Sequence, residues 1–280
     1  MIIKNEKLSI IHFSPNGTTK QILDAIVDGL NYTKTEQIDL IKKDKIKKQK
    51  FTNNDLVLIG APVYSGRIPL MVVNRLQNFK ATNTKAILVV VYGNRHYDDA
   101  LLELKDLVVE LGFYPIAAAA YIGTHSFSSL KYQIAEGRPN TDDLRLAKDF
   151  GKQAMINLKD HKEINVPGTY PYKERSEKLK VKPKIDMDLC DFCGLCREAC
   201  PVDAISIFTD RIDIDENLCI YCHACVKICP QNARIIDDER IIKSAKNLYE
   251  KCKQLQIPEI FLQKSEPQNS QRNTKKKILA

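Results

Sequence analysis

Eight of the nine cysteines in this 280-residue chain lie in one stretch and form two groups with the same spacing. Each group reads Cys-x2-Cys-x2-Cys-x3-Cys and is followed by proline. The first array is Cys190, Cys193, Cys196 and Cys200, and the second array is Cys219, Cys222, Cys225 and Cys229. Two-residue gaps let a tight loop direct three thiolates at three irons of a cubane, and this spacing is typical of 4Fe-4S ligation. The stretch therefore predicts iron-sulfur chemistry.

The two arrays form an internal repeat with an offset of 29 residues. The match extends to Ile185/Ile214, Asp186/Asp215, Leu189/Leu218, Ala204/Ala233 and Ile207/Ile236. In chains with two such arrays, the last cysteine of each ligates the other cluster. We therefore predict cluster 1 on Cys190, Cys193, Cys196 and Cys229, and cluster 2 on Cys219, Cys222, Cys225 and Cys200. Crossed ligation would tie together a module too small to bury much core.

Other uses of these cysteines are less consistent with the sequence. Disulfides need an oxidising compartment, and no charged-then-apolar leader opens the chain. Zinc usually takes two Cys-x2-Cys pairs on one ion. Purely structural clusters remain an alternative, but two adjacent clusters suit an electron relay better. Cys252 is expected to be a packed thiol in a helix over residues 241–255.

Composition describes a globular chain long enough for one ordinary domain and a small one, with 44% hydrophobic residues. No apolar run reaches the roughly 18 residues of a membrane helix, so no membrane association is expected. The net charge of +8 comes mostly from residues 41–50 and 264–280, which carry +5 and +4. Such local runs favour solvated surface and a frayed tail over nucleic-acid binding. We expect a cytoplasmic protein, where thiols stay reduced.

Charge also separates the cysteine-rich module from the segment before it. Residues 185–238 carry a net charge of −7, whereas residues 161–184 hold seven basic and three acidic side chains. The hypothesis is that this basic linker lies along the acidic module, or that a basic redox partner docks there. The predicted domains are therefore 1–160, a linker at 161–184, the module at 185–238, and a helix with a basic tail at 239–280.

The first half of the chain alternates strand and helix patterns. Strands are predicted at residues 8–13, 35–40, 55–60, 86–92 and 116–122, and helices at 22–30, 68–79, 98–111 and 141–158. This alternation predicts an α/β fold with a parallel sheet covered on both faces. Five strands with a loop of phosphate-binding type after the first fit the order 2-1-3-4-5, in which a ligand sits at the carboxyl ends of the strands.

Three loops meet at that predicted edge. The loop after the first strand combines glycine, hydroxyl side chains and a following helix N-terminus, which suits a phosphate. The other two loops carry aromatic, glycine and polar residues, which suit a flat heteroaromatic ring. The candidate residues are Ser14, Pro15, Asn16, Gly17, Thr18 and Thr19; Pro62, Val63, Tyr64, Ser65 and Gly66; and Tyr92, Gly93, Asn94 and Tyr97. His125, after the fifth strand, lies at the same edge, and His223 is expected to tune a cluster rather than ligate it.

These loops, with the double cysteine array behind them, resemble flavodoxin-like proteins fused to a bacterial-type two-cluster ferredoxin. The resemblance covers roughly residues 1–240 and implies FMN, with its phosphate in the first loop and its ring between the other two. Tyr64 and Tyr97 are the candidates to flank the ring. Asn16 departs from the resemblance, because flavodoxins usually carry threonine or serine there.

The predicted function is electron transfer between two 4Fe-4S clusters and FMN, joining one-electron and two-electron steps. The partner would be a redox protein that donates or accepts electrons. One alternative is a flavin-dependent reductase of a small-molecule acceptor. Another is a ferredoxin whose flavodoxin-like domain lost its flavin and serves as a docking surface. No Ser/His/Asp or Cys/His nucleophile set stands out in the sequence.

Overall fold

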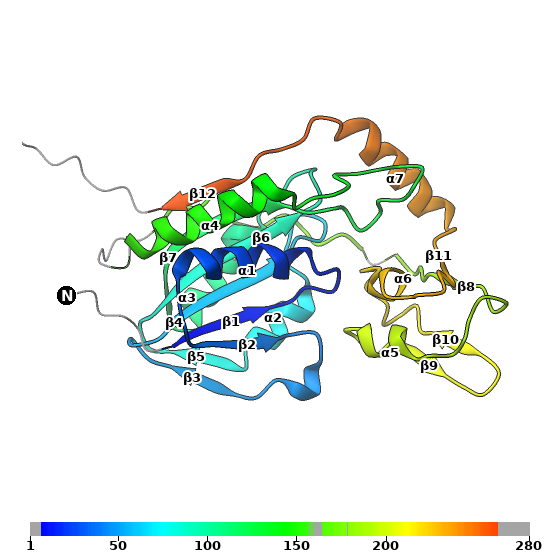
Figure 1. Cartoon of the computed structure of the whole chain (residues 1–280), viewed down its shortest axis with the longest axis horizontal. Coiled ribbons are helices and arrows are strands. Elements are labelled where there is room, and N and C mark those ends of the chain that lie inside the picture. Colours follow the sequence, from blue (N-terminus) through cyan, green and yellow to red (C-terminus); the bar gives the residue numbers. More distant parts are fainter. Residues whose placement is uncertain (1–6, 157, 159–163, 178, 263–280) are drawn as a thin grey trace, which may run out of the picture.

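The computed structural model describes residues 7–156, 158, 164–177 and 179–262. Its main body is a six-stranded sheet in the order β12-β7-β6-β4-β1-β2 (Figure 1). The strands are β1 (Leu8–His12), β2 (Thr35–Asp39), β4 (Leu56–Pro62), β6 (Thr84–Tyr92), β7 (Phe113–Ile122) and β12 (Glu259–Leu262). The first five of these strands pair in parallel, in the spatial order β2-β1-β4-β6-β7. If these five are counted one to five along the chain, this is the order 2-1-3-4-5. The predicted α/β fold class is confirmed.

Helices cover both faces of this sheet. Helices α1 (Thr18–Leu30) and α4 (Thr141–Ile156) bury their apolar sides against one face. Helices α2 (Leu70–Leu76) and α3 (Ala100–Glu110) cover the other face. The central strands β4 and β6 are almost completely buried, which explains why they read as continuous apolar runs rather than as alternating patterns. A small parallel pair, β3 (Gln49–Phe51) and β5 (Phe79–Ala81), was not predicted.

Helices α1 and α4 cross at two glycines. A Cβ atom on Gly29 would lie 1.9 Å from the carbonyl oxygen of Lys148 and 3.1 Å from the Cα atom of Gly151. A Cβ on Gly151 would lie 2.3 Å from the carbonyl oxygen of Ile26. Both clashes involve backbone, which cannot rotate away. The two helices therefore depend on glycine to approach this closely.

Gly29→Ala is expected to destabilise the protein although alanine favours a helix by about 1 kcal/mol. Separating α1 from α4 costs more, because overpacking a close contact typically costs about 1–3 kcal/mol. We expect a net loss of about 1–2 kcal/mol in the free energy of unfolding, measured by chemical denaturation. Asp28→Ala, an exposed change in the same helix turn, is the matched control and should leave stability nearly unchanged. A Gly29→Ala variant as stable as this control would contradict the prediction.

The cysteine-rich module contains short elements around the two arrays. They are β8 (Lys184–Ile185), α5 (Leu195–Ala199), β9 (Ile205–Ile207), β10 (Ile212–Ile214), α6 (Ala224–Lys227) and β11 (Arg234–Ile235). Strand β9 pairs with β10, and β8 pairs with β11, both antiparallel. The β8–β11 pair joins the start of the first repeat to the end of the second. This is the small α+β module that the sequence predicted.

The C-terminal segment returns to the main sheet. Helix α7 (Glu239–Lys251) leaves the cysteine-rich module, and β12 then pairs antiparallel with β7, from Glu259 opposite Ala120 to Leu262 opposite Ala117 (Figure 1). The prediction placed residues 239–280 outside the sheet and therefore missed this sixth strand. The basic tail falls in residues 263–280, outside the described residues. Within the described ranges, no helix has the length and apolar character to cross a bilayer.

Candidate cofactor sites

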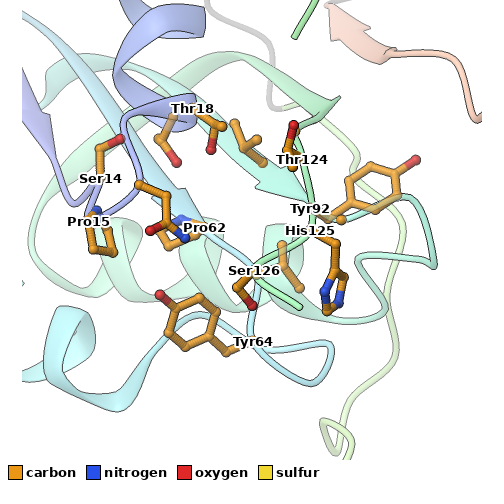
Figure 2. A pocket seen from close by; sticks show the side chains of 15 residues that line it. Ser14, Pro15, Thr18, Pro62, Tyr64, Tyr92, Thr124, His125 and Ser126 are labelled. Atoms are coloured by element: carbon orange, nitrogen blue, oxygen red, sulfur yellow. The ribbon is translucent and has the colours of Figure 1, made fainter. Parts of the chain in front are cut away.

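A pocket opens at the carboxyl ends of the parallel strands (Figure 2). All three predicted loops contribute to it. It is lined by Ser14, Pro15, Asn16, Thr18, Thr19, Pro62, Val63, Tyr64, Tyr92 and Gly93 from these loops, and by Val91, Gly123, Thr124, His125 and Ser126. The last four residues form the loop that follows β7. The sequence prediction included His125 at this edge but missed Thr124 and Ser126, whose small polar side chains carry no distinctive pattern.

The first loop has the geometry of an anion site. The Ser14 hydroxyl oxygen accepts a hydrogen bond from the Lys20 amide at 2.9 Å, which fixes the loop against the first turn of α1. Gly17 precedes the helix with a φ of 82°, a conformation that favours glycine. The amides of a first helical turn have no partner within the helix and carry the positive end of its dipole. Thr18 and Thr19 add hydroxyl groups beside them.

Several residues predicted at the pocket lie elsewhere. Ser65, Gly66, Asn94 and Tyr97 do not line it, whereas Gly17 lies between the lining residues Asn16 and Thr18 and has no side chain of its own to line the pocket. Asn94 is buried, and its amide group donates to the carbonyl oxygens of Cys252 and Gln254. Its side-chain oxygen accepts from the Gln256 amide at 2.8 Å, so Asn94 fixes the segment between α7 and β12 and its amide group has no free edge for a ligand.

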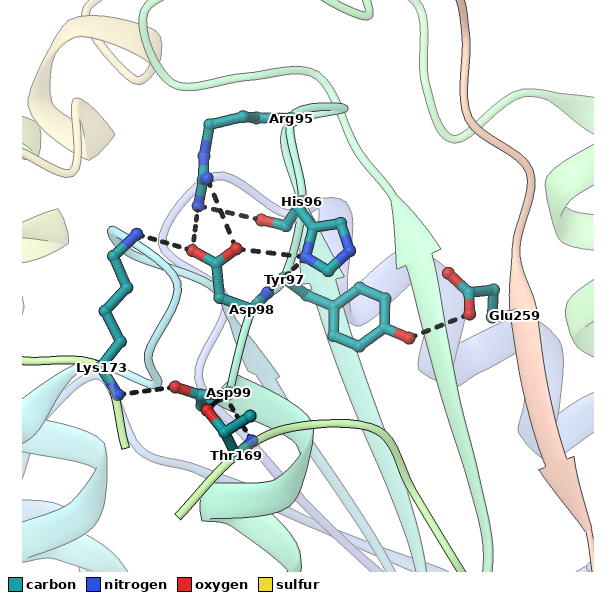
Figure 3. A network of polar contacts seen from close by, with 8 residues as sticks. All are labelled: Arg95, His96, Tyr97, Asp98, Asp99, Thr169, Lys173 and Glu259. Atoms are coloured by element: carbon teal, nitrogen blue, oxygen red, sulfur yellow. Dashed lines mark hydrogen bonds and ion pairs between the residues drawn. The ribbon is translucent and has the colours of Figure 1, made fainter. Parts of the chain in front are cut away.

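Tyr97 is the clearest correction, because it cannot flank a ring in the pocket. Its side chain is 2% exposed and packs against Tyr92 and His96, of which Figure 3 shows His96. Its hydroxyl donates to the Glu259 carboxylate at 3.0 Å. Burial and the Glu259 charge raise the pKa of Tyr97 well above its ordinary value. Tyr97 thus stabilises the pairing of β12 with the sheet rather than a cofactor.

Two pocket residues carry buried polar atoms without a partner in the described part of the chain. These atoms are the Tyr64 hydroxyl and the Asn16 side-chain oxygen. A buried polar group without a hydrogen bond is unfavourable, so such atoms indicate that a ligand completes the site. Burial raises the pKa of Tyr64 well above its ordinary value, with a further contribution from Cys222. Tyr64 therefore offers a neutral hydroxyl and an aromatic face, and the pocket fits FMN.

The eight array cysteines surround two separate cavities. The first is lined by Cys190, Cys193, Cys196 and Cys229, and the second by Cys200, Cys219, Cys222 and Cys225. Each cavity therefore combines three thiols of one array with the fourth thiol of the other. Sulfur atoms also accept hydrogen bonds: the Ala204 amide donates to the Cys200 Sγ atom at 3.3 Å. Four converging thiols with N–H donors to sulfur fit a 4Fe-4S cluster.

The second cavity lies beside the pocket at the sheet edge. The Asn16 amide donates to the carbonyl oxygen of Cys222 at 3.0 Å, so one residue of the phosphate-type loop contacts a residue of the second array directly. The His223 Nδ1 atom forms a hydrogen bond with the carbonyl oxygen of Ser126, which lines the pocket. Burial lowers the pKa of both His223 and His125 to about 4.

Aromatic packing reinforces this interface. Phe127 follows the pocket loop, and its ring lies 5.8 Å from that of Tyr221 and 5.5 Å from that of His223. Tyr221 and His223 flank Cys222 on the chain. The loop after β7 is therefore held against the second array by contacts between these rings.

Two cations hold the cysteine-rich module from the other side. Arg75, on α2 and 7% exposed, donates to the carbonyl oxygen of Pro201 at 2.7 Å and also to those of Leu40 and Ile41. Lys42 donates to the carbonyl oxygen of Cys200 and to the Asp203 carboxylate, both at 3.0 Å. These contacts involve Cys200 and the residues after it, so they too surround the second cavity.

The basic linker divides its contacts between the two domains. Lys173 and Arg175 pair with Asp98 and Glu103 of the first domain, and Lys173 also donates its amide to Asp99 (Figure 3). Among the described linker residues, those at its end contact the acidic module: Lys182 donates to the Ile214 carbonyl oxygen, and Lys184 pairs with Asp237. The expectation that the linker lies along the acidic module is therefore wrong for Lys173 and Arg175.

Comparison with known proteins finds matches for both the sheet domain and the cysteine-rich module. Residues 9–98 match the family model described as a flavodoxin domain, and residues 183–206 and 212–235 match the 4Fe-4S binding domain. The "Uncharacterized protein MJ0298" of Methanocaldococcus jannaschii is 27% identical over 142 residues, covering 50% of this chain and 91% of the relative.

Solved structures give a weaker likeness. A flavodoxin from the domain Archaea shares 15% identity with a TM-score of 0.37, over 55% of this chain and 99% of the other. Flavodoxin 1 from Bacillus cereus shares 18% identity with a TM-score of 0.38, over 54% and 97%. The rubredoxin oxygen:oxidoreductase from Desulfovibrio gigas shares 15% identity with a TM-score of 0.41, over 55% of this chain and only 36% of that one.

The matched flavodoxin domain and 4Fe-4S motifs support a role in electron transfer. More particularly, a flavodoxin domain at residues 9–98 is followed by two 4Fe-4S binding motifs at residues 183–206 and 212–235, which matches a flavodoxin fused to a ferredoxin module. The first array and the second array correspond to the two matched 4Fe-4S motifs.

Proposed function

We propose that this protein transfers electrons within one chain between two 4Fe-4S clusters and FMN. The observation that carries the proposal is the contact between Asn16 and Cys222, which brings the second array to the wall of the pocket. Clusters exchange single electrons, whereas flavin accepts one or two, so the pair would join one-electron and two-electron chemistry. The external partner would be a redox protein, and we propose a cytoplasmic setting.

The proposed ligands follow the two cavities and the pocket. Cluster 1 would be held by Cys190, Cys193, Cys196 and Cys229, and cluster 2 by Cys200, Cys219, Cys222 and Cys225. The phosphate of FMN would bind the loop from Ser14 to Thr19, and its ring would lie near Tyr64, Tyr92 and Gly93. The flavodoxin-like domain would comprise residues 1–160 together with β12, and the ferredoxin module residues 185–238.

Asn16 is relevant to the alternative that the flavodoxin-like domain has lost its flavin and serves only as a docking surface. Its departure from the usual flavodoxin residue was the one sequence feature in favour of that alternative. In this chain the Asn16 amide contacts the ferredoxin module. An interdomain role therefore accounts for asparagine at this position, and its side-chain oxygen is buried without a partner in the described part of the chain.

Anaerobic purification followed by iron, sulfide and flavin analysis tests the proposal. We expect FMN and iron in the same chain, with enough iron for two clusters. After a flash-generated one-electron donor reduces the clusters, flavin reduction should follow with a rate independent of protein concentration. Iron without flavin, or a rate that rises with protein concentration, would contradict electron transfer within the chain.

Phe127→Ala is expected to slow that internal step severalfold. The ring seals the contact between the pocket loop and the residues flanking Cys222, so its loss admits water and loosens the interface. The same flash experiment measures the effect. Phe208→Ala is the matched control, because Phe208 is 44% exposed and packs on Arg211 within the ferredoxin module. Equal rates for the two variants would show that the Phe127 contact does not matter.

A further inference from the structure

A buried cation lies at the wall of the first cysteine cavity. Arg234 begins β11 and is only 6% exposed. Its NH2 group donates to the Cys196 Sγ atom at 2.6 Å, while its NH1 group is buried without a hydrogen-bond partner in the described part of the chain. No carboxylate of the described residues pairs with it. A buried guanidinium is costly unless a negative group compensates its charge, and an anionic cluster would do so.

The internal repeat makes this arginine informative. The residue 29 positions earlier is Ile205, which is 4% exposed and lines the second cavity. Arg234 lines the first cavity at the equivalent place. The two cavities therefore share a backbone plan, but Arg234 adds a buried positive charge at the first cavity. The first cavity also has Asp191 where the second has Ile220, and because Asp191 is exposed, solvent screens its charge more than that of the buried Arg234.

Hydrogen bonds to sulfur differ in the same way. At the second cavity, the sulfur of Cys200 accepts from the neutral amide of Ala204 at 3.3 Å. At the first cavity, the sulfur of Cys196 accepts from a charged guanidinium. Charge-assisted hydrogen bonds are roughly twice as strong as neutral ones. Arg234 thus favours extra negative charge at the first cavity in two ways, through its stronger hydrogen bond to sulfur and through its positive charge.

The cations near the second cavity act less directly on its sulfurs. Lys42 contacts the carbonyl oxygen of Cys200 and is paired with Asp203, which offsets its charge. Arg75 contacts carbonyl oxygens, including that of Pro201. Arg234 also acts on Cys225 of the second cavity. Burial raises the pKa of the Cys225 thiol, and the positive charge of Arg234 partly offsets this rise. Its hydrogen bond, however, goes to Cys196 of the first cavity.

We propose that Arg234 raises the reduction potential of cluster 1 above that of cluster 2. The inference rests on the proposed function, since it requires both cavities to hold clusters. The step concerned is the addition of one electron from a one-electron donor, with no bond made or broken at the protein. Adding negative charge beside a fixed buried cation is favourable, so the first electron rests on cluster 1. Cluster 2, next to the flavin pocket, is reduced second.

An anaerobic potentiometric titration followed by electron paramagnetic resonance tests this assignment. The unmodified protein should show two separated reduction steps. Arg234→Ile, which copies the equivalent Ile205, should lower the higher potential and narrow the separation, while Arg234→Lys should restore part of it. Arg211→Ile is the control, because Arg211 is exposed, pairs with Asp210 and Asp213, packs on Phe208, and lines neither cysteine cavity.

Arg234→Gln keeps an N–H donor but removes the charge. It replaces Arg234→Ile in the titration if the isoleucine variant loses iron. Full iron content with unchanged potentials in Arg234→Gln or Arg234→Ile would overturn the inference and leave the proposed function intact. A drop confined to the lower potential would also overturn it, because the arginine would then act on the other cluster. Absence of iron from the unmodified protein would instead contradict the proposed function.

Discussion

Cys229→Ala is expected to remove the cluster of the first array, although Cys229 itself belongs to the second array. The Cys229 side chain lines the cavity of Cys190, Cys193 and Cys196. Its loss leaves that site with three thiolates, and the second cavity keeps all four. Iron content should fall by about half, and the internal transfer to flavin should persist, because cluster 2 adjoins the pocket.

Cys200→Ala is the reciprocal change and separates crossed from local ligation. Cys200 lies in the first array but lines the second cavity. Crossed ligation predicts that this variant loses the cluster beside the pocket, so the concentration-independent reduction of flavin should disappear. If instead the four cysteines of each array held one cluster, the results would be reversed. Transfer to flavin would be lost in Cys229→Ala and kept in Cys200→Ala. Flash kinetics and iron analysis on both variants therefore decide the arrangement.

Cys252→Ala provides the control for both substitutions. Cys252 follows α7 and lines neither cysteine cavity. We expect full iron content and unchanged transfer in this variant. A loss of iron comparable to that in Cys229→Ala would show that thiol replacement alone perturbs the protein.

Local patterns account for most of what the sequence predicts correctly. The apolar run of β6 and the amphipathic spacing of α1 are properties of neighbouring residues, so the parallel sheet follows from them. The cysteine spacing is equally local, and the predicted crossed sets are the sets of thiols that line the two cavities; their ligation of clusters stays a prediction. The pocket loops are predictable because carboxyl ends of parallel strands meet at one edge.

The errors concern contacts between residues distant in the sequence. Strand β12 is only four residues long, so its sequence carries no clear strand pattern. What identifies it as a strand is its pairing with the alanines of β7, which is visible only in the structure. That pairing also buries Tyr97, which looked available for a cofactor when only its own loop was considered. The domain interface uses side-chain donors on backbone carbonyls, as in Arg75 to Pro201, and any residue can offer a carbonyl. No sequence pattern marks such partners.

Glu103 shows how strongly one buried carboxylate can join distant segments. It lies on α3, is 6% exposed, and accepts hydrogen bonds at 2.8 Å from both Nε and NH2 of Arg67. It also accepts from NH2 of Arg175 in the linker and from the amide of Ile68. The hydrogen bond from Arg67 to Glu103 raises the pKa of Arg67, so the guanidinium is firmly charged. Loop, helix and linker therefore depend on one side chain.

Glu103→Ala is expected to lower the free energy of unfolding by about 3–5 kcal/mol, because it leaves two partly buried arginines without their shared anion. FMN binding should weaken as well, since Arg67 pairs through its backbone with Tyr64 at the pocket, with N–O distances of 2.9 and 3.1 Å. Glu103→Gln keeps an acceptor and should lose less. Glu110→Ala, exposed at the end of the same helix, is the matched control and should shift stability by no more than about 0.5 kcal/mol. Anaerobic denaturation that finds Glu103→Ala and Glu110→Ala equally stable would refute the central role of this carboxylate.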